Sequence, residues 1–286
     1  MPVPATPLPA GFHCHVANIG IKDSTDDFVV VAADTRCSAA GVFTRSSFAG
    51  PSVLVSRRHV ADLGAQAVVV ISKNANVATG PTGLANAEQV AATVAARLGV
   101  PADDVLIAST GVIGRQYPMD RVRAGLAELP SVLTGTDAAD VARGIMTTDT
   151  VMKVASATAG AARVVGVAKG VGMIEPDMAT LITLLFTDAL VAPDELDAMF
   201  RRVIDRTFNC VSVDTDTSTS DTAIVLASGV AGPVSADELE AALEAVAGSL
   251  TKQVARDGGS WIVVGRPITR APDPAAAARI IAAALG

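Results

Sequence analysis

The sequence is poor in aromatic residues and in charge. Aromatic residues make up 3% of the 286 residues and charged residues 18%, against roughly 25% charged in an average globular chain. The net charge is −7, and Lys and Arg do not cluster. Nucleic acids and anionic membrane surfaces require basic patches. We therefore expect neither as a partner, and we expect a small-molecule enzyme.

Long apolar runs are also missing. No stretch reaches the 18 or so consecutive apolar residues that a membrane-spanning helix needs. Residues 1–12 contain four prolines and neither the basic segment nor the apolar segment of a secretory signal. We expect no membrane span and no secretory signal, and we interpret this segment as a mobile arm stiffened by proline.

Cysteine and histidine are scarce. Cys14, Cys37 and Cys210 are far apart and form no Cys-x-x-Cys pair. An odd, scattered set fits the reducing cytoplasm better than a disulfide framework. His13 and His15 flank Cys14, but too few further ligands lie near them in sequence for a zinc site. We predict a cytoplasmic protein without metal or cofactor.

Small apolar residues, mostly Ala and Val, dominate the half of the sequence that is hydrophobic, and they predict a core of small, closely packed side chains. Periodicity indicates an α/β fold. Short β-branched runs predict strands over 28–33, 67–72, 105–108, 163–168 and 224–227. Helical spacing predicts helices over 86–98, 118–129, 138–146, 194–208 and 236–255. Asn86 and Ser235 are the expected N-caps of two of them.

The segment 214–222 is rich in Asp, Ser and Thr. Its first residues alternate like a calcium loop, but an EF-hand needs Gly at the sixth position and Glu at the twelfth. Those positions hold Thr219 and Val225. We therefore expect a hydroxyl-rich loop that lines a polar pocket.

The segment 146–189 carries the chemistry. Gly170 and Gly172 lack the third glycine of a dinucleotide-binding loop, and no phosphate-binding Gly-Lys-Ser/Thr occurs. Thr180 follows the small Ala179 and precedes an apolar run. A threonine hydroxyl is a weak nucleophile unless a base takes its proton. Cleavage before Thr180 would create an α-amine with a pKa of about 7.7–8.0, which suits a general base at neutral pH.

Seven motifs resemble the ornithine acetyltransferase family, the bifunctional glutamate N-acetyltransferases of arginine biosynthesis, and most closely the variant associated with clavulanic-acid gene clusters. They follow one another in the family's order over roughly residues 10–255. The motifs are Gly41–Thr44, Lys73–Gly80, Ser109–Gly114, Met146–Thr150, Ala168–Met173, Pro176–Thr180 and Asp216–Thr222.

This resemblance implies self-cleavage between Ala179 and Thr180. Thr180 would then take acetyl from N-acetylornithine and pass it to glutamate in a ping-pong reaction. Thr110 and Gly111 would form the oxyanion hole, and Thr147 and Lys169 would contact substrate together with Thr180. A lone lysine such as Lys169 could equally be a solvated surface charge.

The resemblance also implies a layered α/β/β/α fold of the N-terminal-nucleophile type and an α2β2 heterotetramer after cleavage. We divide the chain into an α-chain region, 1–179, a shortened β-chain region, 180–255, and an atypical tail, 256–286.

The end of the chain departs from the family pattern. The family's Asp-Gly-Glu motif supplies a substrate-binding Glu, but Asp257 and Gly258 are followed by Gly259. The family's later Pro-Asn-Trp-Gly-Arg motif is absent. The tail instead resembles the last βα unit of orotidine 5′-phosphate decarboxylases, in which the residues at Gly265 and Arg266 bind phosphate. We interpret the C-terminal part as truncated or replaced.

Two alternatives remain at this point. The first is an N-terminal-nucleophile amidohydrolase, in which water replaces glutamate as the acyl acceptor because the acceptor pocket is incomplete. The second is an inactive, truncated or fused remnant of the family that acts at most through interactions.

Overall fold

The computed structural model describes residues 5–171, 181–210 and 218–258, together with residues 273, 275, 276 and 279. The expected nucleophile Thr180, the residue before it, Ala179, and most of the tail, including Gly265 and Arg266, lie outside the described residues.

The strands of the described part form one sheet of eight, in the order β4-β3-β2-β8-β7-β6-β5, with β1 paired to β2. Their bounds are β1 Phe12–Ala17, β2 Phe28–Phe43, β3 Gly64–Ile71, β4 Val105–Ser109, β5 Lys153–Ala159, β6 Ala162–Lys169, β7 Ile182–Leu190 and β8 Thr222–Pro233. Among the strand pairs of the described part, β3–β4 and β7–β8 are parallel and the others are antiparallel.

The long strand β2 belongs to both halves of the sheet. Its first half pairs with β1 and β3, and its second half, from Ser38, pairs with β8. The register with β3 shifts between Ala32 and Cys37. An extra-residue irregularity of this kind bends and twists a strand. The bend at this point allows the two halves to pack against each other.

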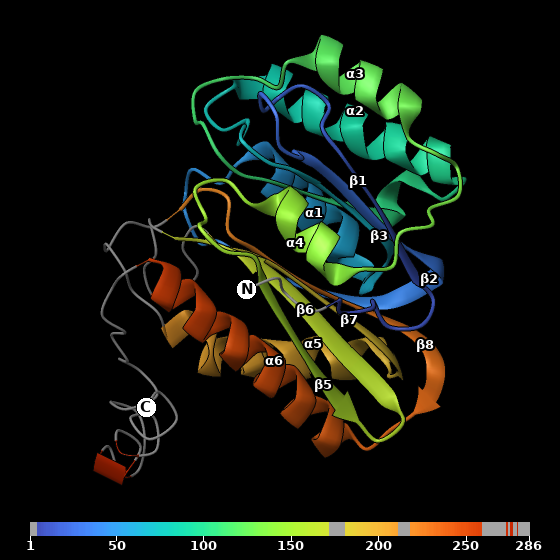
Figure 1. Cartoon of the computed structure of the whole chain (residues 1–286), viewed down its shortest axis with the longest axis vertical. Coiled ribbons are helices and arrows are strands. Elements are labelled where there is room, and N and C mark those ends of the chain that lie inside the picture. The colour runs from blue at the N-terminus through green and yellow to red at the C-terminus, as the bar shows by residue number, and fades with distance from the viewer. Residues whose placement is uncertain are drawn as a thin grey trace.

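Helices cover the outer faces of both halves. Figure 1 shows α2 and α3 at one end of the molecule, α5 and α6 at the other, and the strands between them. The helices are α1 Pro51–His59, α2 Gly80–Leu98, α3 Met119–Glu128, α4 Ala138–Ile145, α5 Pro193–Arg206 and α6 Ala236–Asp257, with short 3-10 turns at Val60–Asp62, Ala102–Asp104 and Phe208–Cys210.

Alternating side chains build three core layers. In β7, Leu184 and Phe186 enter the central layer, where α4 also packs, while Leu185 enters the layer beneath α5 and α6. In β2, Val29 faces the central layer and Val30 faces α2 and α3. This alternation follows from the two-residue period of a strand. The layered α/β/β/α arrangement is confirmed, and so is the core of Ala and Val.

Several local expectations were wrong. Helix α2 begins at Gly80, so Asn86 lies inside it and is not its N-cap. Ser235 does stand at the N-cap of α6, but its side chain makes no capping hydrogen bond. The strands β1, β5 and β7 were not predicted. β1 and β5 mix small and polar residues, and for β7 the sequence indicates only an apolar run.

The N-terminal segment is docked from residue 5 onward, contrary to the expected mobile arm. Leu8 is 6% exposed in the central core, and its N–H donates to the carbonyl of Thr136. The N–H of Ala10 donates to the carboxylate of Asp188. Proline lacks one donor but is tolerated at a sheet edge, so the prolines here do not prevent docking. Among the described residues, none of the helices is long and apolar enough to cross a membrane.

Candidate active site

Thr110 and Lys169 meet although they come from different halves of the sheet. Thr110 follows β4, and its N–H donates to the carbonyl of Ile71 at the end of β3 (3.1 Å). Lys169 is the last residue of β6. Its Nζ lies 3.4 Å from Oγ1 of Thr110, and both residues are buried. The interpretation of Lys169 as a solvated surface charge is therefore wrong.

Gly111 has a backbone conformation that excludes a side chain. Its φ is +127°, and a Cβ would stand 2.1 Å from the carbonyl carbon of Lys73. The N–H groups of Thr110 and Val112 donate to the carbonyls of Ile71 and Lys73. The N–H of Gly111 lies between these two and donates to no carbonyl in the described part of the chain.

A buried carboxylate, Asp149, organises the surroundings of Lys169. Its Oδ1 accepts from the N–H of Gly170 (2.7 Å) and from Nζ of Lys153 (2.8 Å). Its Oδ2 accepts from the N–H of Thr147 (3.0 Å) and lies 4.0 Å from Nζ of Lys169. One carboxylate thus contacts Thr147 and Lys169, two of the three residues that the sequence predicts as substrate contacts.

The array of charges continues away from Thr110. Nζ of Lys153, which is fully buried, lies 2.6 Å from Oδ2 of Asp257 at the end of α6. Asp257 also accepts from the N–H of Thr150 (3.1 Å). Opposite charges therefore alternate from Asp257 through Lys153 and Asp149 to Lys169, so each buried charge has a partner, as burial requires.

Burial and these partners shift the pKa values in opposite directions. Burial lowers the pKa of Lys169, and the nearby Asp149 offsets only part of this effect. For Asp149, burial alone would raise the pKa, but Lys169, Lys153 and the N–H of Gly170 together hold it below its usual value. Asp149 therefore stays ionised beside an ammonium whose proton is held less tightly than usual.

A second buried carboxyl, Asp221, contacts the residue that follows Thr180 in the chain. The N–H of Leu181 donates to Oδ1 of Asp221 (2.7 Å). Burial raises the pKa of Asp221 to about 8, although the N–H of Leu181, the hydroxyl of Ser218 and the charge of Lys169 all lower it. Ile182 pairs with Lys169 in the β6–β7 ladder, so Leu181 and Lys169 lie at the same end of these two strands.

The hydroxyl-rich loop is polar and buried where it is described. Ser218, Ser220, Asp221 and Thr222 are all at most 6% exposed. Oγ1 of Thr44 donates to the carbonyl of Ser218 (2.6 Å). The first part of this loop, including Asp214 and Asp216, lies outside the described residues.

Sequence reasoning missed the roles of Asp149, Lys153, Asp257 and Asp221. Asp149 and Asp221 do belong to two of the motifs named above, and this membership could have marked them as functional. The spacing of residues in the sequence does not indicate which side chains they contact. The described residues contain no group of three or more His, Cys, Asp or Glu that could hold a metal ion.

Comparison with known proteins identifies the family. The family model described as "ArgJ family" matches residues 13–285. A relative from Nostoc sp., "Arginine biosynthesis bifunctional protein ArgJ 2", is 49% identical over 281 residues, which are 98% of this chain and 73% of that protein. "Glutamate N-acetyltransferase Oat2" from Streptomyces clavuligerus is 52% identical over 276 residues, which are 95% of this chain and 70% of that protein.

A solved structure is similar as well. The ornithine acetyltransferase of Mycobacterium tuberculosis, crystallised with ornithine, matches with a TM-score of 0.51 and 30% identity, over 63% of this chain and 98% of that chain. The match to the family model extends through the tail to residue 285. The resemblance of the tail to the decarboxylases stays a prediction. The resemblance to the ornithine acetyltransferases is confirmed, and the chain belongs to the ArgJ family.

Proposed function

We propose that this chain is a self-cleaving acetyltransferase that moves acetyl from N-acetylornithine to glutamate through an acyl intermediate on Thr180. The observation that carries the proposal is the contact of Lys169 with Thr110 at the end of β6, where Lys169 pairs with Ile182, the first residue of β7. The names of the relatives support the same activity, since they include a glutamate N-acetyltransferase and an ornithine acetyltransferase.

Thr110 and Gly111 form the oxyanion hole in this proposal. Because the hydroxyl oxygen of Thr110 accepts from Lys169, its own proton remains available for a second acceptor. The N–H of Gly111 is the other donor. Two donors aimed at the developing oxyanion, with the ammonium of Lys169 behind one of them, stabilise the tetrahedral intermediate.

The chemistry then runs through Thr180. Cleavage of the Ala179–Thr180 bond consumes one water and frees the α-amine. The Thr180 oxygen attacks the acetyl carbon, the bond from that carbon to the ornithine nitrogen breaks, and the hydroxyl proton passes through the α-amine to the leaving nitrogen. In the second half-reaction the amine of glutamate attacks the acetyl carbon and the Thr180 hydroxyl is restored.

The chain length of the mycobacterial relative is consistent with cleavage at this position. The match covers 63% of 286 residues, about 180 residues, and these account for 98% of the matched chain. The segment before Thr180 has a similar length. We also propose an α2β2 assembly of the two products and a cytoplasmic location.

Intact-mass spectrometry of the purified protein, with and without N-acetylornithine, tests the proposal. We expect two chains that correspond to residues 1–179 and 180–286, with one acetyl group added to the second chain by the substrate. Thr180→Ala should give one chain and no acetyl group. Thr158→Ala, at an exposed threonine of β5, is the matched control and should behave like the unmutated protein.

An unmutated protein that is always recovered as one chain would overturn the proposal. Release of acetate without formation of N-acetylglutamate would instead establish the amidohydrolase. One intact chain that never carries acetyl and never turns over would establish the inactive remnant.

A further inference from the structure

Lys22 links the segment between β1 and β2 to the acyl-transfer site. Its Nζ donates to the carbonyl of Met146 (2.6 Å), 124 positions later in the sequence, and to the carbonyl of Asp26 (2.5 Å). Met146 directly precedes Thr147, one of the predicted substrate contacts. The acetyltransferase proposal gives Lys22 no role.

One peptide group is held at both of its polar atoms. The carbonyl of Met146 and the N–H of Thr147 belong to the same peptide bond, which is planar and rigid. Nζ of Lys22 donates to this carbonyl, and Oδ2 of Asp149 accepts from this N–H (3.0 Å). Hydrogen bonds with a charged partner are about twice as strong as neutral ones. An ammonium and a carboxylate therefore fix the plane of this peptide, and with it the position of Thr147.

The peptide depends on these side chains because secondary structure does not hold it. Met146 stands at the C-cap of α4, where the carbonyls have no donor within the helix. Thr147 lies between α4 and β5, in a segment that forms neither helix nor strand. A lysine at a helix C-terminus also interacts favourably with the helix dipole. Lys22 thus ends α4 and orients the residue that follows it.

A buried carboxylate holds Lys22 itself in place. Asp27 is fully buried and accepts from three backbone N–H groups, those of Ile19 (2.8 Å), Ile21 (2.7 Å) and Lys22 (2.7 Å). The segment between β1 and β2 is therefore curled around one carboxylate. The position of the ammonium is set before any substrate arrives, so substrate binding does not have to order it.

Lys22 is half-buried and lies within electrostatic range of the site. Burial lowers the pKa of Lys22, and the nearby carboxylates, Asp27 foremost, oppose this effect. Burial also lowers the pKa of Lys169, and the charge of Lys22 lowers it further. Removal of Lys22 could thus act on a ligand through charge alone, so a test has to separate this effect from the orientation of Thr147.

We propose that Lys22 is a positioning residue of the acyl-transfer site, which orients the Met146–Thr147 peptide so that Thr147 meets an amino-acid substrate. The inference rests on the proposed function in one respect, because it takes Thr147 as a substrate contact. It depends neither on cleavage before Thr180 nor on an acyl intermediate.

Isothermal titration of the full chain with ornithine tests the proposal without any turnover. Ornithine is the amino acid with which the mycobacterial relative was crystallised. Thr147→Ala should raise the Kd at least about fivefold, the effect of one neutral hydrogen bond, and Lys22→Met at least about threefold, part of the same effect. The double variant should bind no more weakly than Thr147→Ala alone, because Lys22 acts through Thr147. Lys22→Arg keeps a cationic donor and should restore most of the affinity.

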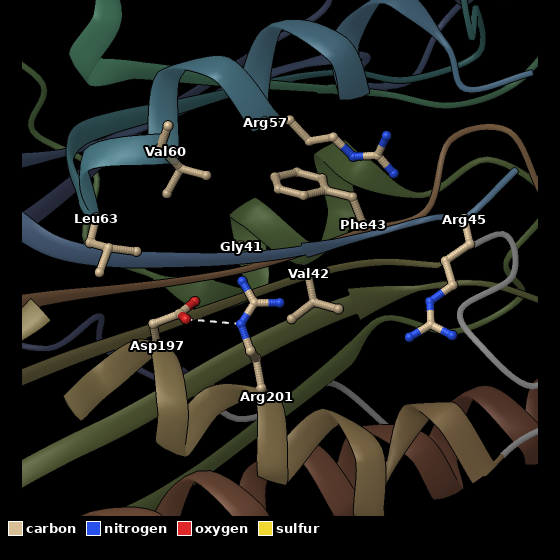
Figure 2. A pocket seen from close by; sticks show the side chains of 10 residues that line it. Gly41, Val42, Phe43, Arg45, Arg57, Val60, Leu63, Asp197 and Arg201 are labelled. Carbon is tan, nitrogen blue, oxygen red and sulfur yellow. Dashed lines mark hydrogen bonds and ion pairs between the residues drawn. The ribbon is translucent and has the colours of Figure 1, made fainter. Parts of the chain in front are cut away.

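Two other cations that donate to backbone carbonyls serve as matched controls. Arg121 of α3 donates to the carbonyl of Gly20, in the same segment as Lys22. Arg57 of α1 donates to the carbonyl of Thr44 and lines a separate cavity of about 340 Å³ between α1 and α5 (Figure 2). None of the predicted substrate contacts within the described residues lines that cavity. Arg121→Met and Arg57→Met should both bind ornithine like the unmutated protein.

An unchanged Kd in Lys22→Met would refute the proposal, and with a lowered melting temperature it would leave Lys22 only a structural role at the end of α4. Losses that add up in the double variant would also refute it, since Lys22 would then act on the ligand without Thr147. If the unmutated protein does not bind ornithine, this proposal and the proposed function fail together. Binding of ornithine without cleavage or acetyl transfer would overturn the proposed function alone.

Discussion

Nζ of Lys169 lies 3.4 Å from the hydroxyl oxygen of Thr110, although 59 positions separate the two residues. The contact bridges the two halves of the sheet, because Thr110 follows β4 and Lys169 ends β6. It combines a positive charge and a polarised hydroxyl, which is the combination that a developing oxyanion requires.

Lys169→Met should lower kcat/KM for acetyl transfer by about 10² or more, because one stabilising interaction of the oxyanion is lost. Steady-state kinetics with N-acetylornithine and glutamate measure the effect. Arg97→Met, at an exposed position of α2, is the control for loss of a positive charge and should change little. Equal activity of Lys169→Met and the unmutated protein would remove Lys169 from the mechanism.

Gly111→Ala should destroy the oxyanion hole. A Cβ at this position would overlap the backbone of Lys73, so the loop must move. We expect a loss of about 10²–10³ in kcat/KM, as for removal of an oxyanion donor. Gly114→Ala is the matched control, since its φ of +82° is also positive but nothing lies within 4 Å of the added carbon. Similar losses in both variants would show that φ, and not the overlap, decides the effect.

Asp149→Asn should shift the pH dependence of activity. Asp149 raises the pKa of Lys169 against the effect of burial, so its neutralisation lets that pKa fall further. If the reaction needs the protonated lysine, the loss of activity on the alkaline side should begin at a lower pH than in the unmutated protein. The alkaline limb of the kcat/KM profile should therefore shift to lower pH. Asp257→Asn is the control, because Asp257 pairs with Lys153 and does not contact Lys169. This variant should leave the alkaline limb in place. An unchanged limb in Asp149→Asn would show that the carboxylate does not act on Lys169.

Asp221→Asn should flatten the dependence of stability on pH. The pKa of Asp221 is raised to about 8, so between pH 4 and pH 8 the folded chain holds a proton that the unfolded chain has released. The contribution of this group to the free energy of unfolding is therefore largest below its unfolded pKa of about 4. It decreases as the pH rises to 8, by up to about 1.4 kcal/mol per pH unit. Asparagine cannot ionise and removes this slope. Urea denaturation at pH 5, 6, 7 and 8 measures it, and parallel curves for both proteins would contradict the raised pKa.

The strands that the sequence predicted have interiors buried on both faces, but for β7, which is equally buried, the sequence indicates only an apolar run and not a strand. Phe28–Phe43 and Gly64–Ile71 contain β-branched runs, which are typical of interior strands. The strands Phe12–Ala17 and Lys153–Ala159 carry polar side chains between small ones, and only their pairing in the sheet makes them strands. The helix Gly80–Leu98 was predicted to begin only at Asn86, because Asn86 suits an N-cap, whereas the helix already starts at Gly80 with a proline in its first turn, where proline is tolerated.

The site could be predicted only in part, for a similar reason. Thr110, Gly111, Thr147 and Lys169 were named through the resemblance of motifs, and the structure brings Thr110, Thr147 and Lys169 around one buried array. The contact of Lys153 with Asp257 spans 104 positions. No local pattern encodes such a partner, because it depends on where α6 ends relative to β5.

The sheet order decides how the two pieces of a severed chain would behave. β7 and β8 come after Thr180, yet they are inserted between β6 on one flank and β2 on the other, both of which precede it. The strands of the two fragments would thus alternate within one sheet. Separating the fragments would require breaking the hydrogen bonds of the β2–β8 and β6–β7 pairs together. A nicked protein should elute from gel filtration as a single particle in native buffer and come apart only in denaturant.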